Sequence, residues 1–275
     1  MIQSAGPELT ATTCDTLGAG ELRREANLLS TLISDHEDRW GGALARRQRR
    51  ARRPASHITM QTSILRMSKS IVSAGIDVGG QKKGFHAIAM RDHAILGKTS
   101  SCDPTEIATW CKESGAAVVG VDAPISWSKT GRARSAERTL MQQGIWCFST
   151  PTEKAAKAHP TNHFGWMLQG TKLYRALDKS FARFDGTNER ARPICFETFP
   201  HAIACALSGA PVPAKNKYKI RRALLAKAGI SCDPLTNIDF VDAALCAFTA
   251  HYFARSQYVQ YGDTDEGCIV VPRLR

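Results

Sequence analysis

The sequence predicts an α/β domain built on one mixed β-sheet, in which a three-strand antiparallel meander is followed by parallel strands and helices flank the sheet. Two observations carry this prediction. Short apolar runs bounded by Gly or Pro recur after residue 70, as is typical of buried strands. Helical segments separate the later runs, so the later strands are reached by crossovers and lie parallel to their neighbours.

The first three strands follow one another with short connections. An apolar run over residues 71–78 ends in an acid and glycines, and residues 84–91 and 94–99 form two further runs separated by a two-residue turn. Connections this short join antiparallel neighbours. We therefore expect these three strands to form the meander.

Helices and buried strands alternate in the rest of the chain. Residues 103–111 are predicted as a helix with Pro104 in its first turn, and residues 116–122 as a buried strand. Another strand is expected over residues 193–200, where a Pro stops it. The intervening segment, about 125–192, is rich in Gly, His, Trp and basic residues, and we interpret it as an inserted segment of helices and loops.

The final predicted helix, residues 238–254, is apolar on nearly all sides and has Asn237 as a candidate N-cap. A helix with this composition is expected to be buried. A shorter helix is expected over residues 201–207, and a basic cluster surrounds the next helix along the chain.

The first 66 residues differ from the rest. They include the basic run 46–53, and we expect residues 1–66 to form a mostly mobile, Arg-rich extension in front of a domain that spans residues 67–275. The extension carries 10 Lys and Arg against 7 Asp and Glu, so +9 of the net charge of +12 belongs to the domain. This charge favours a polyanionic partner, nucleic acid first.

The composition also bears on location. The nine cysteines include no Cys-x-x-Cys pair, which favours reduced thiols and a cytoplasmic protein. No apolar run approaches the roughly 18 residues that span a bilayer, so no membrane partner is expected. The sequence leaves the oligomeric state open, a homodimer included.

Acids recur at the ends of the apolar strands. Asp77 ends the first strand and is followed by glycines, and Asp122 ends a later strand just before Ala123 and Pro124. Each one alone is also explained as a turn residue. Glu197 lies within a strand among apolar neighbours, where an unpaired carboxylate would be strongly desolvated and would need a partner.

Two further acids lie on the final helix. Asp239 and Asp242 are separated by three residues and share one helical face. Asp239, in the first turn, also has a structural explanation in the helix dipole. Asp242 lies further inside the apolar helix and requires a metal, a cation or a donor network.

Together the acids predict a divalent metal site. Carboxylates from strand ends and from one helix provide the all-oxygen donor set that suits Mg²⁺ or Mn²⁺. Two such ions activate water and stabilise the leaving oxygen of a phosphodiester, so no Ser or Cys nucleophile is needed. We expect catalysis by Asp77, Asp122, Glu197 and Asp242, with Asp239 as a further metal ligand.

The residues just described resemble the ribonuclease H-like superfamily, including the RuvC-type resolvases, and are most similar to domain-of-unknown-function family 429 (DUF429). Four segments carry the resemblance: Gly75–Asp77, Val119–Pro124, Cys195–Pro200 and Asp239–Ala243. It spans roughly residues 71–252. It implies a ribonuclease H-like fold and metal-dependent hydrolysis of phosphodiester bonds, the activity predicted for that family.

Two alternative functions remain open. One is a basic nucleic-acid-binding protein whose acids are structural. The other is a phosphotransferase of the actin and sugar-kinase type, in which the segment 77–82 would cradle a phosphate, although the domain is short for that class and shows no late Gly-rich nucleotide motif. The residues expected to contact nucleic acid are Lys82, Lys83, Arg132, Arg134, Lys215, Lys217, Lys219 and Arg222.

The aromatic and histidine residues are expected to have structural roles. Trp127, Trp146 and Trp166 are expected to pack in the core or in a lid rather than to stack on bases. The histidines, His86 among them, show no metal-ligand spacing. His201 follows Glu197 by four residues, but Pro200 prevents a common helix.

Overall fold

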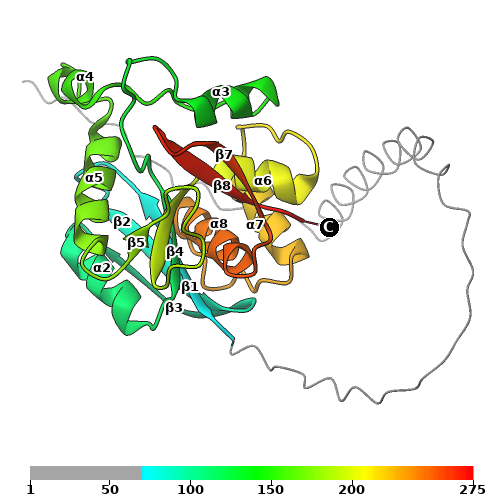
Figure 1. The fold of residues 1–275 in the computed structure, drawn as a ribbon. Coiled ribbons are helices and arrows are strands. Elements are labelled where there is room, and N and C mark those ends of the chain that lie inside the picture. The colour runs from blue at the N-terminus through cyan, green and yellow to red at the C-terminus, as the bar shows by residue number, and fades with distance from the viewer. Residues whose placement is uncertain (1–69, 275) are drawn as a thin grey trace, which may run out of the picture. The chain divides into compact units, whose positions relative to one another are not determined.

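One mixed sheet forms the centre of the computed structural model, which describes residues 70–274 (Figure 1). Within these residues the strand order is β3-β2-β1-β4-β6-β8-β7, and the short strand β5 pairs with β6. The strands are β1 (Val72–Val78), β2 (Phe85–Arg91), β3 (Ala94–Ser101), β4 (Val118–Asp122), β5 (Ala182–Arg183), β6 (Ile194–Thr198), β7 (Tyr258–Asp263) and β8 (Gly267–Pro272). The predicted extension, residues 1–66, lies outside the described residues, and so does the expectation that it is mobile.

The strand directions confirm the predicted mixed sheet. β1 is antiparallel to β2, and β2 is antiparallel to β3, which gives the meander. The pairs β1–β4, β4–β6 and β6–β8 are parallel. The terminal hairpin of β7 and β8 was not predicted: β7 is an edge strand without an apolar run, and the apolar run Cys268–Val271 of β8 was overlooked.

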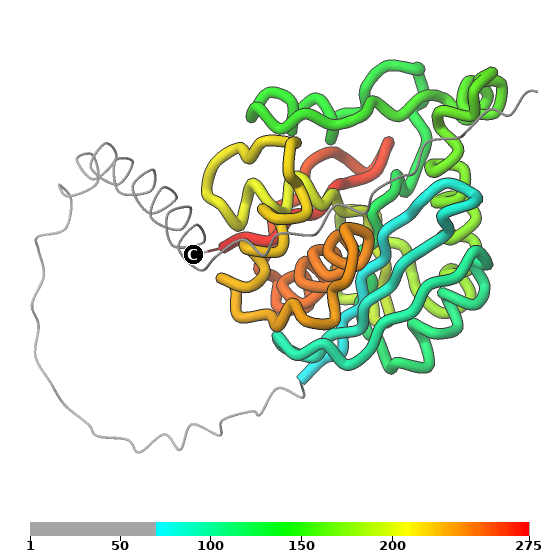
Figure 2. Tube along the Cα trace, turned by 180° about the vertical axis from the view of Figure 1, so that it is seen from behind, coloured from blue at the N-terminus to red at the C-terminus, as the bar shows by residue number. Residues whose placement is uncertain are grey.

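Helices cover both faces of the sheet (Figure 1, Figure 2). α2 (Pro104–Glu113) and α5 (Gly165–Leu177) pack together on one face. α8 (Ile238–Phe253) lies against β1, β2 and β4 on the other face, where α6 (Pro200–Ser208) and α7 (Lys217–Lys227) pack on it. The two remaining helices of residues 70–274 are α3 (Ser135–Gln142), against β7 and β8, and α4 (Glu153–Ala158), against α5.

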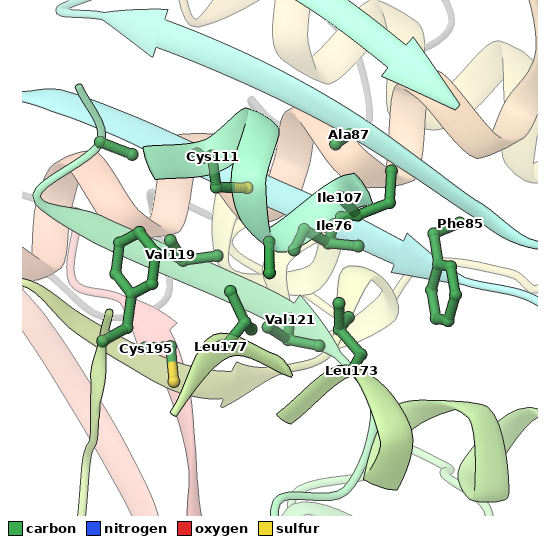
Figure 3. Close-up of a cluster of buried hydrophobic side chains, with 14 of the residues drawn as sticks. Ile76, Phe85, Ala87, Ile107, Cys111, Val119, Val121, Leu173, Leu177 and Cys195 are labelled. Carbon is green, nitrogen blue, oxygen red and sulfur yellow. The ribbon is translucent and has the colours of Figure 1, made fainter. Parts of the chain in front are cut away.

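The core on the first face joins the sheet to α2 and α5. Ile76 of β1 and Val121 of β4 project towards Ile107 of α2 and Leu173 of α5 (Figure 3). All four side chains are fully buried, so this face is sealed by apolar contacts. The predicted insertion, about residues 125–192, contains α3, α4, α5 and β5 and thus supplies part of this core.

The predicted helix starts agree with the structure. Asp103 caps α2 by accepting a hydrogen bond from the Thr105 N–H (2.7 Å), and Pro104 is the first helical residue. Asn237 caps α8 by accepting one from the Phe240 N–H (2.9 Å). Within residues 70–274 no helix is long and apolar enough to cross a membrane.

Two glycines bring α8 close to the sheet. Gly75 of β1 and Gly120 of β4 are register partners, so they lie side by side on the face towards α8. A Cβ added at Gly75 would lie 2.0 Å from the Ala247 nitrogen and 2.1 Å from the Ala243 oxygen, and one at Gly120 would lie 2.7 Å from the Cys246 oxygen. The backbone of α8 therefore rests directly on these two positions.

We expect Gly75→Ala to destabilise the domain, because the added methyl group collides with the α8 backbone rather than with a movable side chain. Overpacking of this kind costs typically about 1–3 kcal/mol. Gly80→Ala is the matched control, since a Cβ there meets nothing within 4 Å. Urea unfolding of both variants measures the difference, and equal stabilities would contradict the proposed role of Gly75.

Candidate functional site

Three polar side chains cross the sheet in one row. His86 of β2, Asp77 of β1 and Asp122 of β4 are register partners on three neighbouring strands. Asp77 lies two residues after Gly75, and Asp122 two residues after Gly120, so both acids share the face on which α8 rests. The row therefore lies at the carboxyl ends of β1 and β4, beside the start of α8.

α8 adds a third acid to this row. Asp242 immediately precedes Ala243, whose carbonyl lies over Gly75, so the close approach of helix and sheet brings Asp242 to the strand ends. Asp77, Asp122 and Asp242 line one cleft of about 730 Å³. Asp77 and Asp242 are only 6% and 4% exposed, so their carboxylates are largely withdrawn from water.

Cations accompany the acids. The Lys83 Nζ lies 2.6 Å from the Asp239 Oδ1 and 3.6 Å from the Asp77 Oδ2. Arg221 of α7 donates a hydrogen bond to the Asp242 Oδ1. Lys83, Lys217 and Arg221 all line the same cleft, so it combines a carboxylate cluster with positive charge.

The crowded carboxylates resist ionisation. Burial, reinforced by Asp242 and Asp239 and only partly opposed by Lys83, raises the pKa of Asp77 to about 7. Burial, followed by the charges of Asp77 and Asp242, holds the pKa of Asp122 well above its usual range. The pKa of Asp242 is also raised, by burial first, although Arg221 opposes the shift.

The raised pKa of Asp77 predicts a pH-dependent stability. Between about pH 4 and pH 7 the folded protein binds a proton at Asp77 that the unfolded chain has lost, so the free energy of unfolding falls as the pH rises. In metal-free buffer we expect a fall on the order of a few kcal/mol across this window, and a smaller fall in Asp77→Asn. Urea unfolding at several pH values measures it, and identical pH profiles for the two proteins would contradict it.

The donor atoms fit a divalent cation. The Asp77 Oδ2 is buried without a hydrogen-bond partner, and ligand atoms of Asp77, His86 and Asp239 all lie within 4.8 Å of one another. Burial lowers the pKa of His86, which favours the neutral imidazole that can ligate a metal. Asp122 and Asp242 line a cleft together with Asp77 and so present further carboxylate oxygens beside this group.

Glu197 does not join the other acids, contrary to the sequence-based expectation. It is the register partner of Val121, which faces α2 and α5, whereas Asp122 faces α8. The alternation of side chains along β4 and β6 therefore sends Glu197 to the opposite face of the sheet. There it lines a cavity of about 40 Å³ that adjoins the cleft and shares Asp122, Phe148 and Trp166 with it.

A buried network holds Glu197 in that position. The Arg134 guanidinium donates to both Glu197 oxygens (2.9 and 2.5 Å), and the Ile125 N–H donates to one of them (2.8 Å). Arg134 also donates to Glu137 (2.8 Å), which in turn accepts from the Thr150 N–H (3.0 Å). Every oxygen of Glu197 is thus already bound, which suits a structural carboxylate better than a metal ligand.

Arg134 was expected to contact nucleic acid, and the structure corrects this. Its side chain is 1% exposed and lies between two carboxylates, so it cannot reach a phosphate in solution. Arg222 also differs from expectation, because its guanidinium donates to the carbonyls of Cys232 (2.6 Å) and Leu235 (2.7 Å). Both arginines hold the fold together.

The other predicted basic residues are exposed. Lys83 and Lys217 line the cleft, as expected of phosphate-binding groups. Lys215 and Lys219 are exposed beside Lys217, at the start of α7. The remaining two, Lys82 and Arg132, are exposed on loops and do not line the cleft.

Sequence reasoning missed several residues in or beside the site. His86 is placed by strand register, which its spacing from other histidines does not reveal. Arg221 belongs to the recognised basic cluster, but only its burial against Asp242 distinguishes it. Trp146 was expected in a core or lid, yet it is exposed and lines the cleft together with Phe148.

Comparison with known protein families gives a match. The family model described as "Protein of unknown function (DUF429)" matches residues 75–266. No curated protein is similar enough to be matched. Among solved structures, Thermus thermophilus RuvC is 19% identical with a TM-score of 0.37, and T. thermophilus RuvC in complex with a Holliday junction substrate is 16% identical with a TM-score of 0.36. Both matches cover 68% of this chain and 96% of the other.

Proposed function

The chain belongs to the DUF429 family, and from this premise we propose that it is a metal-dependent hydrolase that cleaves phosphodiester bonds of nucleic acid. One observation carries the proposal: Asp77, Asp122 and Asp242 line a single cleft, and burial raises the pKa of each, with repulsion from neighbouring aspartates adding to the shift at Asp77 and Asp122. Perturbed carboxylates that meet in a cleft are characteristic of functional sites.

Mg²⁺ or Mn²⁺ is the cofactor that this donor set suits. Asp77, His86 and Asp239, whose ligand atoms lie within 4.8 Å of one another, would hold one ion, and Asp122 and Asp242 offer further carboxylate oxygens in the cleft that Asp77 also lines. When bound, such ions activate water and stabilise the leaving oxygen of a phosphodiester, one or two ions serving this role.

The chain's own cations would bind the substrate. Lys83 and Lys217 are exposed on the cleft and can pair with phosphate oxygens. Arg221 is buried and paired with Asp242, so its role is to orient that carboxylate. The net charge of +12 adds a long-range attraction between the protein and a polyanionic substrate.

The proposal is tested by incubating the protein with single-stranded DNA, duplex DNA, RNA and branched DNA in Mg²⁺ or Mn²⁺, with EDTA as control. We expect cleavage of at least one substrate, and its loss in EDTA. If no substrate is cleaved with either ion, a nuclease function is excluded for this protein.

A non-catalytic nucleic-acid-binding protein is the second candidate. It is favoured by the ion pairs of Lys83 with Asp239 and of Arg221 with Asp242, which balance two of the acids without any metal. Calorimetric titration with Mn²⁺ separates the two functions. A nuclease binds the ion and loses that binding in Asp77→Asn, whereas the second candidate shows no binding at this site.

A further inference from the structure

Two aromatic side chains are unusually exposed beside the acids. Trp146 is 75% exposed and Phe148 is 61% exposed, and both line the cleft that contains Asp77, Asp122 and Asp242. Among the residues that the structure describes, the third exposed large apolar side chain, Leu96, lies elsewhere on β3. Large apolar groups gathered on one open surface mark a binding site.

The exposed rings belong to a larger aromatic wall. The ring of Phe148 meets that of Trp166 edge to face, with centroids 6.3 Å apart, and that of His163 in the same manner at 6.0 Å. Trp166 and Phe199 also line the cleft. Phe148 is therefore supported by its neighbours while its outer surface stays open to solvent.

The cleft also carries charged residues. Lys83, Lys217 and Arg221 contribute positive charge, and Asp77, Asp122 and Asp242 form the acidic cluster. The aromatic wall lines the same cleft. A ligand that pairs with the cations and also stacks on the aromatic wall must carry phosphate groups together with flat, accessible π faces. A volume of about 730 Å³ admits such a ligand.

Nucleic acid with unpaired bases has this combination. In a duplex the faces of each base are covered by its neighbours, so an aromatic wall has nothing to stack on. In a single strand the bases are free to stack on Trp or Phe while the backbone follows the cations.

We propose that Trp146 and Phe148 stack on unpaired bases and direct the cleft towards single-stranded nucleic acid. This inference rests on the proposed function, because it places the phosphodiester backbone over the acids. Base stacking on an aromatic side chain depends little on the base, so DNA and RNA single strands are both expected to bind.

The experiment measures binding without cleavage. In an Asp77→Asn background, fluorescence anisotropy with labelled single-stranded DNA, single-stranded RNA and duplex DNA of one sequence compares the parent with the variant that also carries Trp146→Ala and Phe148→Ala. We expect single-strand affinity to fall about tenfold or more and duplex affinity to stay unchanged. Trp146→Phe with native Phe148 retains single-strand affinity, and Leu96→Ala serves as the control for an exposed apolar residue outside the cleft.

Each outcome decides the inference. Unchanged single-strand affinity in the double variant, or an equal fall for duplex and single strands, overturns the stacking role. Cleavage by the wild-type protein is assayed separately. If single-strand affinity depends on the two aromatic residues but the wild-type protein cleaves nothing, only the nuclease proposal is contradicted. If the wild-type protein cleaves and the Trp146→Ala, Phe148→Ala substitutions do not change cleavage, only the stacking inference is contradicted.

Discussion

Asp77→Asn is expected to abolish metal-dependent cleavage while the protein stays folded. Asn keeps the shape of the side chain and removes the charge that a divalent ion requires. Loss of a metal ion's contribution of several kcal/mol lowers the rate by about 1000-fold or more, because each ~1.4 kcal/mol is a factor of ten. Initial rates of wild type and variant under saturating Mn²⁺ measure the effect.

The stability of this variant separates catalysis from folding. The Asp77 Oδ2 has no hydrogen-bond partner, and ionising this carboxyl is unfavourable, so Asn is expected to keep or raise stability at neutral pH. Asp265→Asn is the control, because Asp265 is an exposed acid whose partner is Lys129 (3.3 Å). Cleavage by Asp77→Asn within tenfold of the wild-type rate would rule out Asp77 as a metal ligand.

Arg134→Ala is expected to destabilise the domain by about 3–5 kcal/mol, the usual cost of removing one partner from a buried ion pair. The substitution leaves Glu197 and Glu137 buried without their shared cation. Arg138→Ala, in the helix α3 that Arg134 precedes as N-cap, is the control, since Arg138 is exposed. Urea unfolding measures both variants, and a loss below about 1 kcal/mol for Arg134→Ala would show that the network is not structural.

Glu197→Gln tests the catalytic role that the sequence suggested for Glu197. If Glu197 is structural, this variant loses stability, and the loss is coupled to that of Arg134→Ala in a double-mutant cycle. Its cleavage rate under conditions where it is folded stays within about tenfold of wild type. A loss as large as that of Asp77→Asn would instead restore Glu197 to the metal site.

The elements of the sheet were predictable because their evidence is local. Apolar runs identify β1, β2, β4 and β6, and the caps at Asp103 and Asn237 mark the starts of α2 and α8. Predicted and observed boundaries differ by about two residues at most. In the β7–β8 hairpin, β7 lies at the sheet edge, where burial does not enforce an apolar pattern, whereas β8 carries the apolar run Cys268–Val271, which the prediction overlooked.

The candidate site was predictable in part. Asp77, Asp122 and Asp242 each contrast with an apolar neighbourhood, which made them visible in the sequence, and the structure brings them to one cleft. Glu197 contrasts in the same way, but strand register sends it to the other face. Trp146 was expected to pack in the core or in a lid but is exposed, because no local pattern distinguishes an exposed tryptophan from a packed one.

The sequence by itself determined the strands β1 to β4 and β6, the helices α2, α6 and α8, and which acids need a partner, because periodicity, caps and the cost of burying a charge act within short segments. Only the tertiary structure decided which of these side chains meet. The register of β1, β4 and β6 decides on which face of the sheet each acid lies. The absence of side chains at Gly75 and Gly120 allows α8 to pack closely against β1 and β4. Both depend on contacts between residues far apart in the chain, which no local pattern encodes.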